Sequence, residues 1–265
     1  MLAAEKQWQR FTPQERLARF AIYLGVVAAV VFSLRTVEVI PEFLQDAPTQ
    51  IGDLFYRMWP PDVRYYPATV HDALLETVHI ATLGTVFTMI MAVPVGLLAA
   101  RNITPHAALN TLAQLILVST RSVNTLVWAI LFVAVFGPGA LAGTAAIAFR
   151  SIGFVGKLFA EAVENTHRGP IEALRAAGAP WLSVLTMGYW PQVRPAFWSI
   201  ILFRWDINVR ESAILGLVGA GGIGIVLDDA MNLFQWHRVA TVLVSIFAVV
   251  ILAEVAVNAI RKRII

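Results

Sequence analysis

Residues 172–195 read EALRAAGAPWLSVLTMGYWPQVRP, and this stretch lies between two long apolar runs. The pair Gly169-Pro170 just before it breaks a preceding helix, and the alanines that follow favour a new, short helix. Gly178 and Pro180 then end that helix. A helix this polar cannot lie in hydrocarbon, because unpaired polar groups are too costly there. We therefore expect it at a water-facing surface or against a soluble partner.

The chain is too apolar for an ordinary soluble domain, since 58% of its 265 residues are hydrophobic and only 14% are charged. It has no cysteine, which excludes disulfides and thiolate chemistry. Its five histidines show neither an HExxH pattern nor close pairing, so no metal site is expected. The net charge of +3 is small. No nucleic-acid partner is expected, and the placement of charge matters more than its sum.

Several apolar segments approach the length of about 20 residues that a helix needs to cross a bilayer. We predict an all-α, polytopic membrane protein with six transmembrane helices, at residues 17–34, 75–100, 108–136, 140–163, 197–217 and 239–260. In this reading, residues 1–16 form a cytoplasmic tail and residues 35–70 an extracytoplasmic segment. Residues 71–263 form a core with the other five spans. The first span is expected to stay as an anchor, because no small-residue cleavage site follows it.

Basic residues cluster at the N-terminus, in the turn near Arg101, in the loop around Glu172 and at the C-terminus. Six spans place these four clusters on one side of the membrane, and the positive-inside rule makes that side cytoplasmic. Both termini are then cytoplasmic. The acidic 35–70 segment and the pair Asp228-Asp229 fall outside. The polar helix after Gly169 lies inside.

Two glycine motifs resemble nucleotide-binding loops by letter only. The glycines at 219, 221, 222 and 224 match GxGxxG, but they follow a membrane span and no acidic residue stands about 20 positions on. Residues 153–157 lack the spacing of a P-loop. The chain therefore carries no visible ATPase. Two readings of the glycines at 219–224 stay open and are compatible, namely close helix packing and a broken helix near a gate. They concern Gly219, Gly221, Gly222 and Gly224.

Charged residues inside the expected spans face a bundle interior by default. They are Arg121, Arg150, Glu161, Arg204, Asp206, Arg210, Glu211 and Glu254. For most of them structural pairing is the simpler reading. Arg121 lies deepest from either predicted end of its span. We hypothesise that Arg121 and Arg210, with Ser122 and Asn124, shape a polar path for an anion.

The Glu172 stretch resembles the EAA loop of ABC importer permeases. Glu172, Ala173, Gly178 and Pro191 stand in register with that pattern, whereas Leu174 replaces the second alanine. Other stretches resemble the phosphonate-type branch of these permeases, and the likeness covers about residues 70–263. They are Arg121-Ser122, residues 156–161, residues 169–176 and residues 214–224. One departure is Asn124, which stands where the family usually has proline.

The resemblance implies a type I importer fold in the bacterial plasma membrane. Two copies of the permease would form the pathway, and a periplasmic or lipid-anchored binding protein would deliver phosphonate, or phosphate or phosphite. Two separate ATPase subunits would use ATP and Mg, so this chain would be no enzyme and would bind no cofactor. They would dock on the 169–181 coupling helix, through Glu172, Ala173, Leu174, Arg175, Gly178, Ala179 and Trp181.

Two alternatives remain open at this point. The first is the permease of a related importer, such as a methionine type, because such permeases share the Arg-Ser pair and the glycine-rich stretch. The second is an ion-coupled secondary transporter, which would often show internal repeats. We find no repeat in this sequence.

Overall fold

The computed structural model describes residues 11–264 except 38 and 39, and every regular element in that part of the chain is helical. The chain divides into two compact units, residues 1–55 and 56–265. The first unit contains α1 (Pro13–Thr36) and most of α2 (Pro41–Met58). The second contains the remaining helical segments: η1 (Tyr66–Val70), α3 (His71–Ala99), α4 (Ala107–Ser122), α5 (Thr125–Phe136), α6 (Ala140–Glu164), α7 (Arg168–Ala176), α8 (Trp181–Ser183), η2 (Val184–Tyr189), α9 (Trp190–Leu215), η3 (Gly216–Val218), α10 (Ile223–Asn232) and α11 (Trp236–Ile264).

Helix α1 contains the first expected span. Thr12 caps its first turn in a capping box with Glu15: the Thr12 hydroxyl accepts from the Glu15 N–H, and the Glu15 carboxylate accepts from the Thr12 N–H. Its described side chains from Gln14 on are exposed, and the helix is apolar enough to cross a membrane. The helix starts earlier than expected, so residues 13–16 of the expected tail belong to it. Residues 1–10 of that tail lie outside the described residues.

Helix α2 is an element that the sequence reading of residues 35–70 did not predict. Its apolar side chains recur at helical spacing and are exposed: Phe43, Leu44, Ile51, Leu54 and Phe55. Its acidic side chains lie on the opposite face: Glu42, Asp46 and Asp53. Among the described residues of the first unit, α2 is therefore an amphipathic helix whose apolar face is exposed.

The second unit packs through small residues rather than large ones. Helices α3 and α6 make its most extensive contact. A β-carbon on Gly84 would lie 2.7 Å from Ile147, and one on Gly96 would lie 2.9 Å from the Gly156 carbonyl oxygen. Many large apolar side chains point outward instead, such as Leu83, Phe87 and Ile90 of α3. Buried small residues with exposed large ones are typical of helices that associate in lipid.

The expected number of six spans remains a prediction. Three described helical stretches are long and apolar enough by themselves to cross a membrane, and the number rises to five if each of two bent helix pairs counts as one span. Helix α6 occupies the remaining expected span. It has 25 residues and carries Arg150, Lys157, Glu161 and Glu164. The first of these side chains turns inward, as described below, which suits a helix within a bundle.

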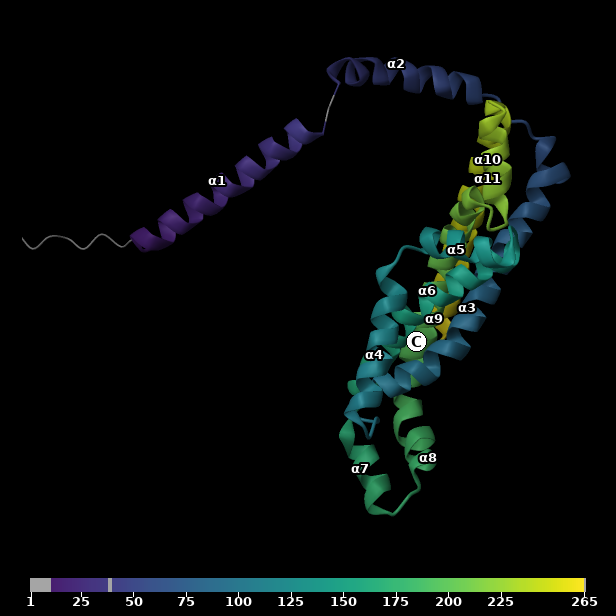
Figure 1. Ribbon diagram of the computed structural model, residues 1–265. Helices are drawn as coiled ribbons and strands as arrows, with labels where there is room; N and C mark the ends of the chain where they lie inside the picture. The colour runs from purple at the N-terminus through teal and green to yellow at the C-terminus, as the bar shows by residue number, and fades with distance from the viewer. Residues whose placement is uncertain (1–10, 38–39, 265) are drawn as a thin grey trace, which may run out of the picture. The chain divides into compact units, whose positions relative to one another are not determined.

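One expected span is broken into two helices, and another is part of a longer helix. Residues 108–136 form α4 and α5, which meet at an angle of 93°. The expected span 197–217 is part of a longer helix, because α9 begins at Trp190. After η3 the chain turns by 44° into α10. Within the second unit, Figure 1 shows α7 and α8 projecting at one end of the bundle, with α10 and the start of α11 toward the other end.

Candidate functional site

The α7 segment ends in a tight left-handed turn. Gly178 has φ +72°, which an L side chain rarely adopts. The Ala179 N–H donates to the Leu174 carbonyl at 3.0 Å, and the Gly178 N–H donates to the Arg175 carbonyl at 3.0 Å. These two bonds form a Schellman motif, which satisfies carbonyl groups at the end of the helix. The expected 169–181 helix is therefore shorter, ending at Ala176, and a turn through Pro180 leads into α8.

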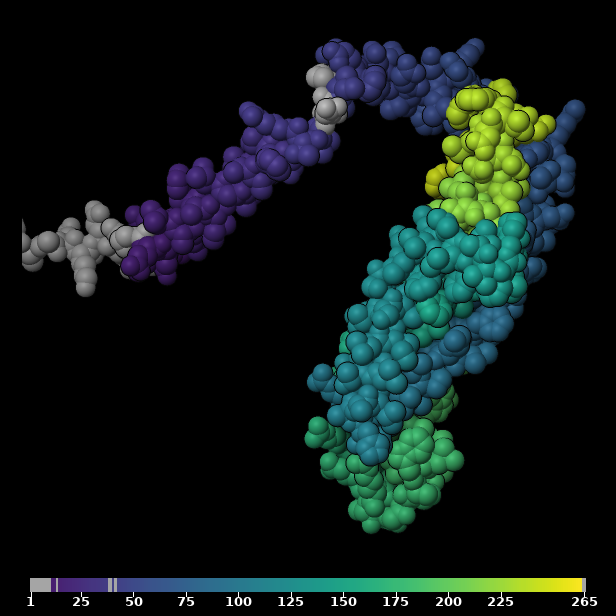
Figure 2. All heavy atoms as spheres, in the orientation of Figure 1, coloured from purple at the N-terminus to yellow at the C-terminus, as the bar shows by residue number. Residues whose placement is uncertain are grey.

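Most side chains of the expected coupling residues are free on the surface. Glu172, Ala173, Arg175 and Gly178 are exposed, whereas Leu174 and Ala179 are half-buried. Trp181 is 60% exposed, an unusual position for so large an apolar side chain. In the space-filling view, this segment forms a knob at one end of the second unit (Figure 2). Small residues therefore lie beside an exposed tryptophan on this surface.

The knob is held to the bundle by close packing. Ile171 of α7 is buried, and a β-carbon on Gly188 of η2 would lie 3.4 Å from it and 3.2 Å from Leu174. Gly188 thus lets α7 pack closely against η2. The neighbouring turn between α3 and α4 joins the same end, because the Arg101 N–H donates to the Glu164 carboxylate at 2.8 Å. The two basic loops therefore lie side by side.

The glycine-rich segment 219–224 is a close-packed break between η3 and α10. Gly219, Gly221 and Gly222 all have positive φ, from +76° to +86°. A β-carbon on Gly221 would lie 2.8 Å from the Ala140 backbone, and one on Gly224 would lie 2.7 Å from the Gly216 Cα. These glycines therefore provide both backbone turns and close helix contacts.

Helix α3 caps the N-terminus of α10, since Gly222 has no side chain to do so. The Ile223 N–H donates to the Thr77 hydroxyl at 2.8 Å. The Ser212 hydroxyl of α9 donates to the Thr77 carbonyl at 3.1 Å. Thr77 is buried. The glycine segment is thus fixed against two other helices by polar contacts inside the bundle.

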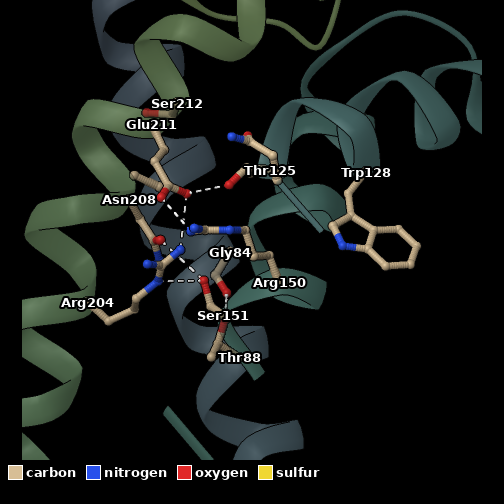
Figure 3. A network of polar contacts seen from close by, with 12 residues as sticks. Gly84, Thr88, Thr125, Trp128, Arg150, Ser151, Arg204, Asn208, Glu211 and Ser212 are labelled. Atoms are coloured by element: carbon tan, nitrogen blue, oxygen red, sulfur yellow. Dashed lines mark hydrogen bonds and ion pairs between the residues drawn. The ribbon is translucent and has the colours of Figure 1, made fainter. Parts of the chain in front are cut away.

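A partly buried ion network joins α5, α6 and α9 in the second unit (Figure 3). The Glu211 carboxylate accepts from Arg150 at 2.7 Å and from Arg204 at 3.0 Å. Arg204 lies seven residues before Glu211, two turns away on one face of α9. Its side chain is 3% exposed. The Thr125 hydroxyl of α5 also donates to Glu211, at 2.8 Å.

Hydrogen bonds extend this network to α3. The Arg204 Nε donates to the Ser151 hydroxyl at 2.8 Å, and Ser151 donates to the Asn208 side-chain oxygen at 3.3 Å. The Asn208 amide then donates to Thr85 of α3 at 2.8 Å. Arg204, Ser151 and Asn208 are buried. Ion pairs at this depth are stabilising only when such hydrogen bonds satisfy the remaining polar atoms.

The structure does not place the expected pathway residues in this network. Arg121, Ser122 and Asn124 are exposed at the bend between α4 and α5. Arg210 is exposed and pairs with Asp206, one turn away on its own helix. Arg210 borders an otherwise apolar groove between α9, α10 and α11. Among the described residues, no contact joins Arg121 and Arg210, so the hypothesis that they shape one polar path stays a prediction.

Asn124 preserves the backbone that a proline would impose. Its φ is −66°, close to the value that a proline ring fixes. It is the N-cap of α5, where its side chain accepts from the Leu126 N–H at 3.0 Å. The 93° bend is present although the family proline is absent.

The sequence reading named Arg150, Arg204 and Glu211 but assigned them no joint role. It did not single out Ser151, Asn208 or Thr125. One sequence signal was available, because Arg204 and Glu211 stand at i and i+7 in the expected span 197–217, which places them on one face of a helix. Nothing in the sequence indicates that Arg150 of α6 reaches the same carboxylate.

A family model described as "Binding-protein-dependent transport system inner membrane component" matches residues 92–265, well over half of the chain. The chain belongs to this family. The phosphite transport system permease protein PtxC of Stutzerimonas stutzeri is 36% identical over 248 residues, covering 94% of this chain and 89% of that protein. The phosphate-import permease protein PhnE of Mycolicibacterium smegmatis is 38% identical over 88% of this chain, which spans only 44% of that longer protein.

A solved structure of the MetNI methionine ABC transporter, in an inward-facing conformation, shows the same fold. It matches with a TM-score of 0.64 at 24% identity and covers 74% of this chain and 96% of the solved chain. The predicted type I importer permease fold is therefore confirmed, and the methionine type is only a distant relative. The family and the apolar helices make this chain a multi-pass component of the inner membrane.

Proposed function

We propose that this chain is the permease subunit of an ATP-driven importer for phosphonates, or for phosphate or phosphite. It forms the pathway by alternating access. The exposed turn after α7 is the observation that carries the permease role, because Glu172, Ala173 and Gly178 of the EAA pattern lie together on a free surface. The names of the relatives, phosphite and phosphate permeases, support the substrate class.

The α7 segment is the docking point for a separate ATPase subunit in this proposal. The exposed part of Glu172–Gly178 and the exposed ring of Trp181 enter a groove on that subunit, while Leu174 and Ala179 hold the segment in shape. ATP and Mg are then bound by the ATPase and not by this chain. Because Ile171 and Gly188 pack the segment closely, it moves as a rigid body when the ATPase subunits close.

The orientation follows from charge. The end of the bundle that carries α7 is basic, through Arg101, Arg168 and Arg175, and belongs in the cytoplasm. The opposite end, with Asp228 and Asp229 in α10, belongs outside, where the glycine segment 219–224 lies near a gate. Both termini are then cytoplasmic.

The amphipathic α2 suits the outer membrane surface. It begins five residues after α1 ends at Thr36, so it starts within about 18 Å of that end. Its apolar face then rests among lipid headgroups and its acidic face points to water.

Two copies of the chain form the pathway, with two ATPase subunits inside. A periplasmic or lipid-anchored binding protein delivers substrate outside. Reconstitution tests this assembly. The permease is placed in liposomes with the ATPase and binding protein that are produced alongside it, and uptake of labelled phosphite and methylphosphonate is measured. We expect uptake that requires both ATP and the binding protein. An excess of unlabelled phosphite should reduce this uptake by at least tenfold.

Methionine serves as the control competitor, since the methionine-type fold is the distant relative. Uptake should be unchanged by an equal excess of methionine. Competition by methionine alone would overturn the substrate class. Uptake by the permease alone, without ATP, would instead favour an ion-coupled secondary transporter.

A further inference from the structure

The buried network of α5, α6 and α9 carries more positive than negative charge. It contains the guanidinium groups of Arg150 and Arg204 but only the Glu211 carboxylate. That carboxylate already accepts from Arg150, Arg204 and Thr125. Within the described residues, neither arginine forms another ion pair. One positive charge therefore stays uncompensated inside the bundle.

The excess charge is available at Arg150 rather than at Arg204. Arg204 is closed in, since its side chain is 3% exposed and its Nε donates to Ser151. The Arg150 side chain is 28% exposed. Among the described residues, no acceptor lies within hydrogen-bond distance of its Nε, although that atom is buried. Arg150 is thus the partly exposed cation of the network, and its Nε has donor capacity that no described acceptor uses.

The surroundings of Arg150 favour an anion. Thr125 is the first residue of α5, so the positive end of that helix lies next to Glu211. Arg121, in the last turn of α4, packs beside α6 one turn away from Arg150, because a β-carbon on Gly153 would lie 2.9 Å from the Arg121 Cβ. Arg150, the base of the Arg121 side chain and a helix N-terminus therefore lie near the bend between α4 and α5.

We infer that Arg150 and the α4–α5 bend form a transit site for a tetrahedral phosphorus oxyanion. This inference rests on the proposed function, because it names where the imported anion is held. A guanidinium matches the oxygens of such an anion with paired N–H donors. Part of the Arg150 guanidinium already donates to Glu211, so fewer of its N–H groups can bind the anion. The anion is therefore held weakly enough to leave, as transport requires.

The absence of cysteine from the chain allows a direct test. Ser122→Cys places one thiol at the exposed end of α4, where the native hydroxyl bonds only to the Ser119 carbonyl among described contacts. The purified permease is treated with a negatively charged and a positively charged methanethiosulfonate reagent of similar size, and both labelling rates are measured. We expect the anionic reagent to react on the order of tenfold faster, since a positive site concentrates anions. Phosphite should slow the labelling of the thiol by the anionic reagent.

Variants on α6 locate the charge. Adding Arg150→Met should reduce the preference for the anionic reagent, because Arg121 alone remains beside the thiol, and should abolish the protection by phosphite. Lys157→Met, on the same helix, is the matched control and should preserve both, because Lys157 is half-buried and paired with Glu161 rather than with Glu211. Equal labelling rates for the two reagents, or a preference that Arg150→Met leaves unchanged, would overturn the site.

The test does not depend on Arg150→Met folding well. If that protein is lost, Arg150→Lys, which keeps the charge, should retain the preference but weaken protection by phosphite. In either case, the Ser122→Cys protein with native Arg150 must react faster with the anionic reagent than with the cationic one, and phosphite must slow that reaction. The labelling also needs no ATPase. A failed transport assay with intact charge preference and phosphite protection would therefore reject the proposed importer and not the anion site.

Discussion

Replacing Gly178 with aspartate is expected to abolish co-purification of the ATPase with this permease. Gly178 lies exposed in the turn after α7, with φ +72° and open space around it. Aspartate there strains the left-handed turn and places a charge in the proposed interface, where an unpaired buried charge costs about 3 kcal/mol or more. We expect at least a hundredfold weaker association, measured by affinity purification of the tagged permease from detergent.

Two control variants separate the causes. Gly178→Ala adds strain without charge. The free energy of association with the ATPase should weaken by only about 1 kcal/mol, so association stays detectable. Ala107→Asp places the same charge at an exposed first position of α4, where a helix N-terminus tolerates it, and should leave association unchanged. Full association of the Gly178→Asp protein would contradict a role for this turn in docking.

Replacing Glu211 with alanine is expected to produce the largest loss of stability. Glu211 is the shared partner of Arg150 and Arg204, and Arg204 is almost fully buried. Removing one partner of a buried ion network leaves uncompensated charge, which typically costs about 3–5 kcal/mol. The expected result is a large fall in the thermal unfolding temperature of the detergent-purified permease, followed by fluorescence of its tryptophans.

Asp206→Ala is the matched control on the same helix. Asp206 pairs with Arg210, whose side chain is exposed and can turn to solvent. Asp206 itself is buried, but its removal leaves no buried charge unpaired, so we expect a smaller loss of stability than for Glu211→Ala. If Glu211→Ala were as stable as Asp206→Ala, the ion network would not hold α6 against α9.

Local patterns were enough to predict the helical class and the position of the α7 turn. Gly178 and Pro180 act within a few residues, so the sequence reveals them directly. The 93° bend before α5 was not predicted, because residues 108–136 were interpreted as one span, although polar residues at 119–122, 124 and 125 stand where the helix breaks. The sequence also could not show that Arg150 reaches Glu211, since 61 residues separate them and only the packing of α6 on α9 brings them together.

The glycines show a similar limit. Close packing was one of two open readings for Gly224, and the structure provides its partner, Gly216. The need for glycine at position 188 was not predicted, because it depends on Ile171 and Leu174 lying across the α7 turn. Pairwise contacts between distant segments decide such positions, and one sequence does not contain them.

The most direct test of the central claim is a cross-link from α7. Ala173→Cys introduces a single exposed thiol on α7 of a chain without cysteine. We predict that a short thiol-reactive photo-cross-linker on this residue joins the permease to the ATPase subunit in membranes, and that a membrane-impermeant reagent added outside intact cells does not label it. Labelling from outside, or no cross-link in an assembled and active transporter, would contradict the account.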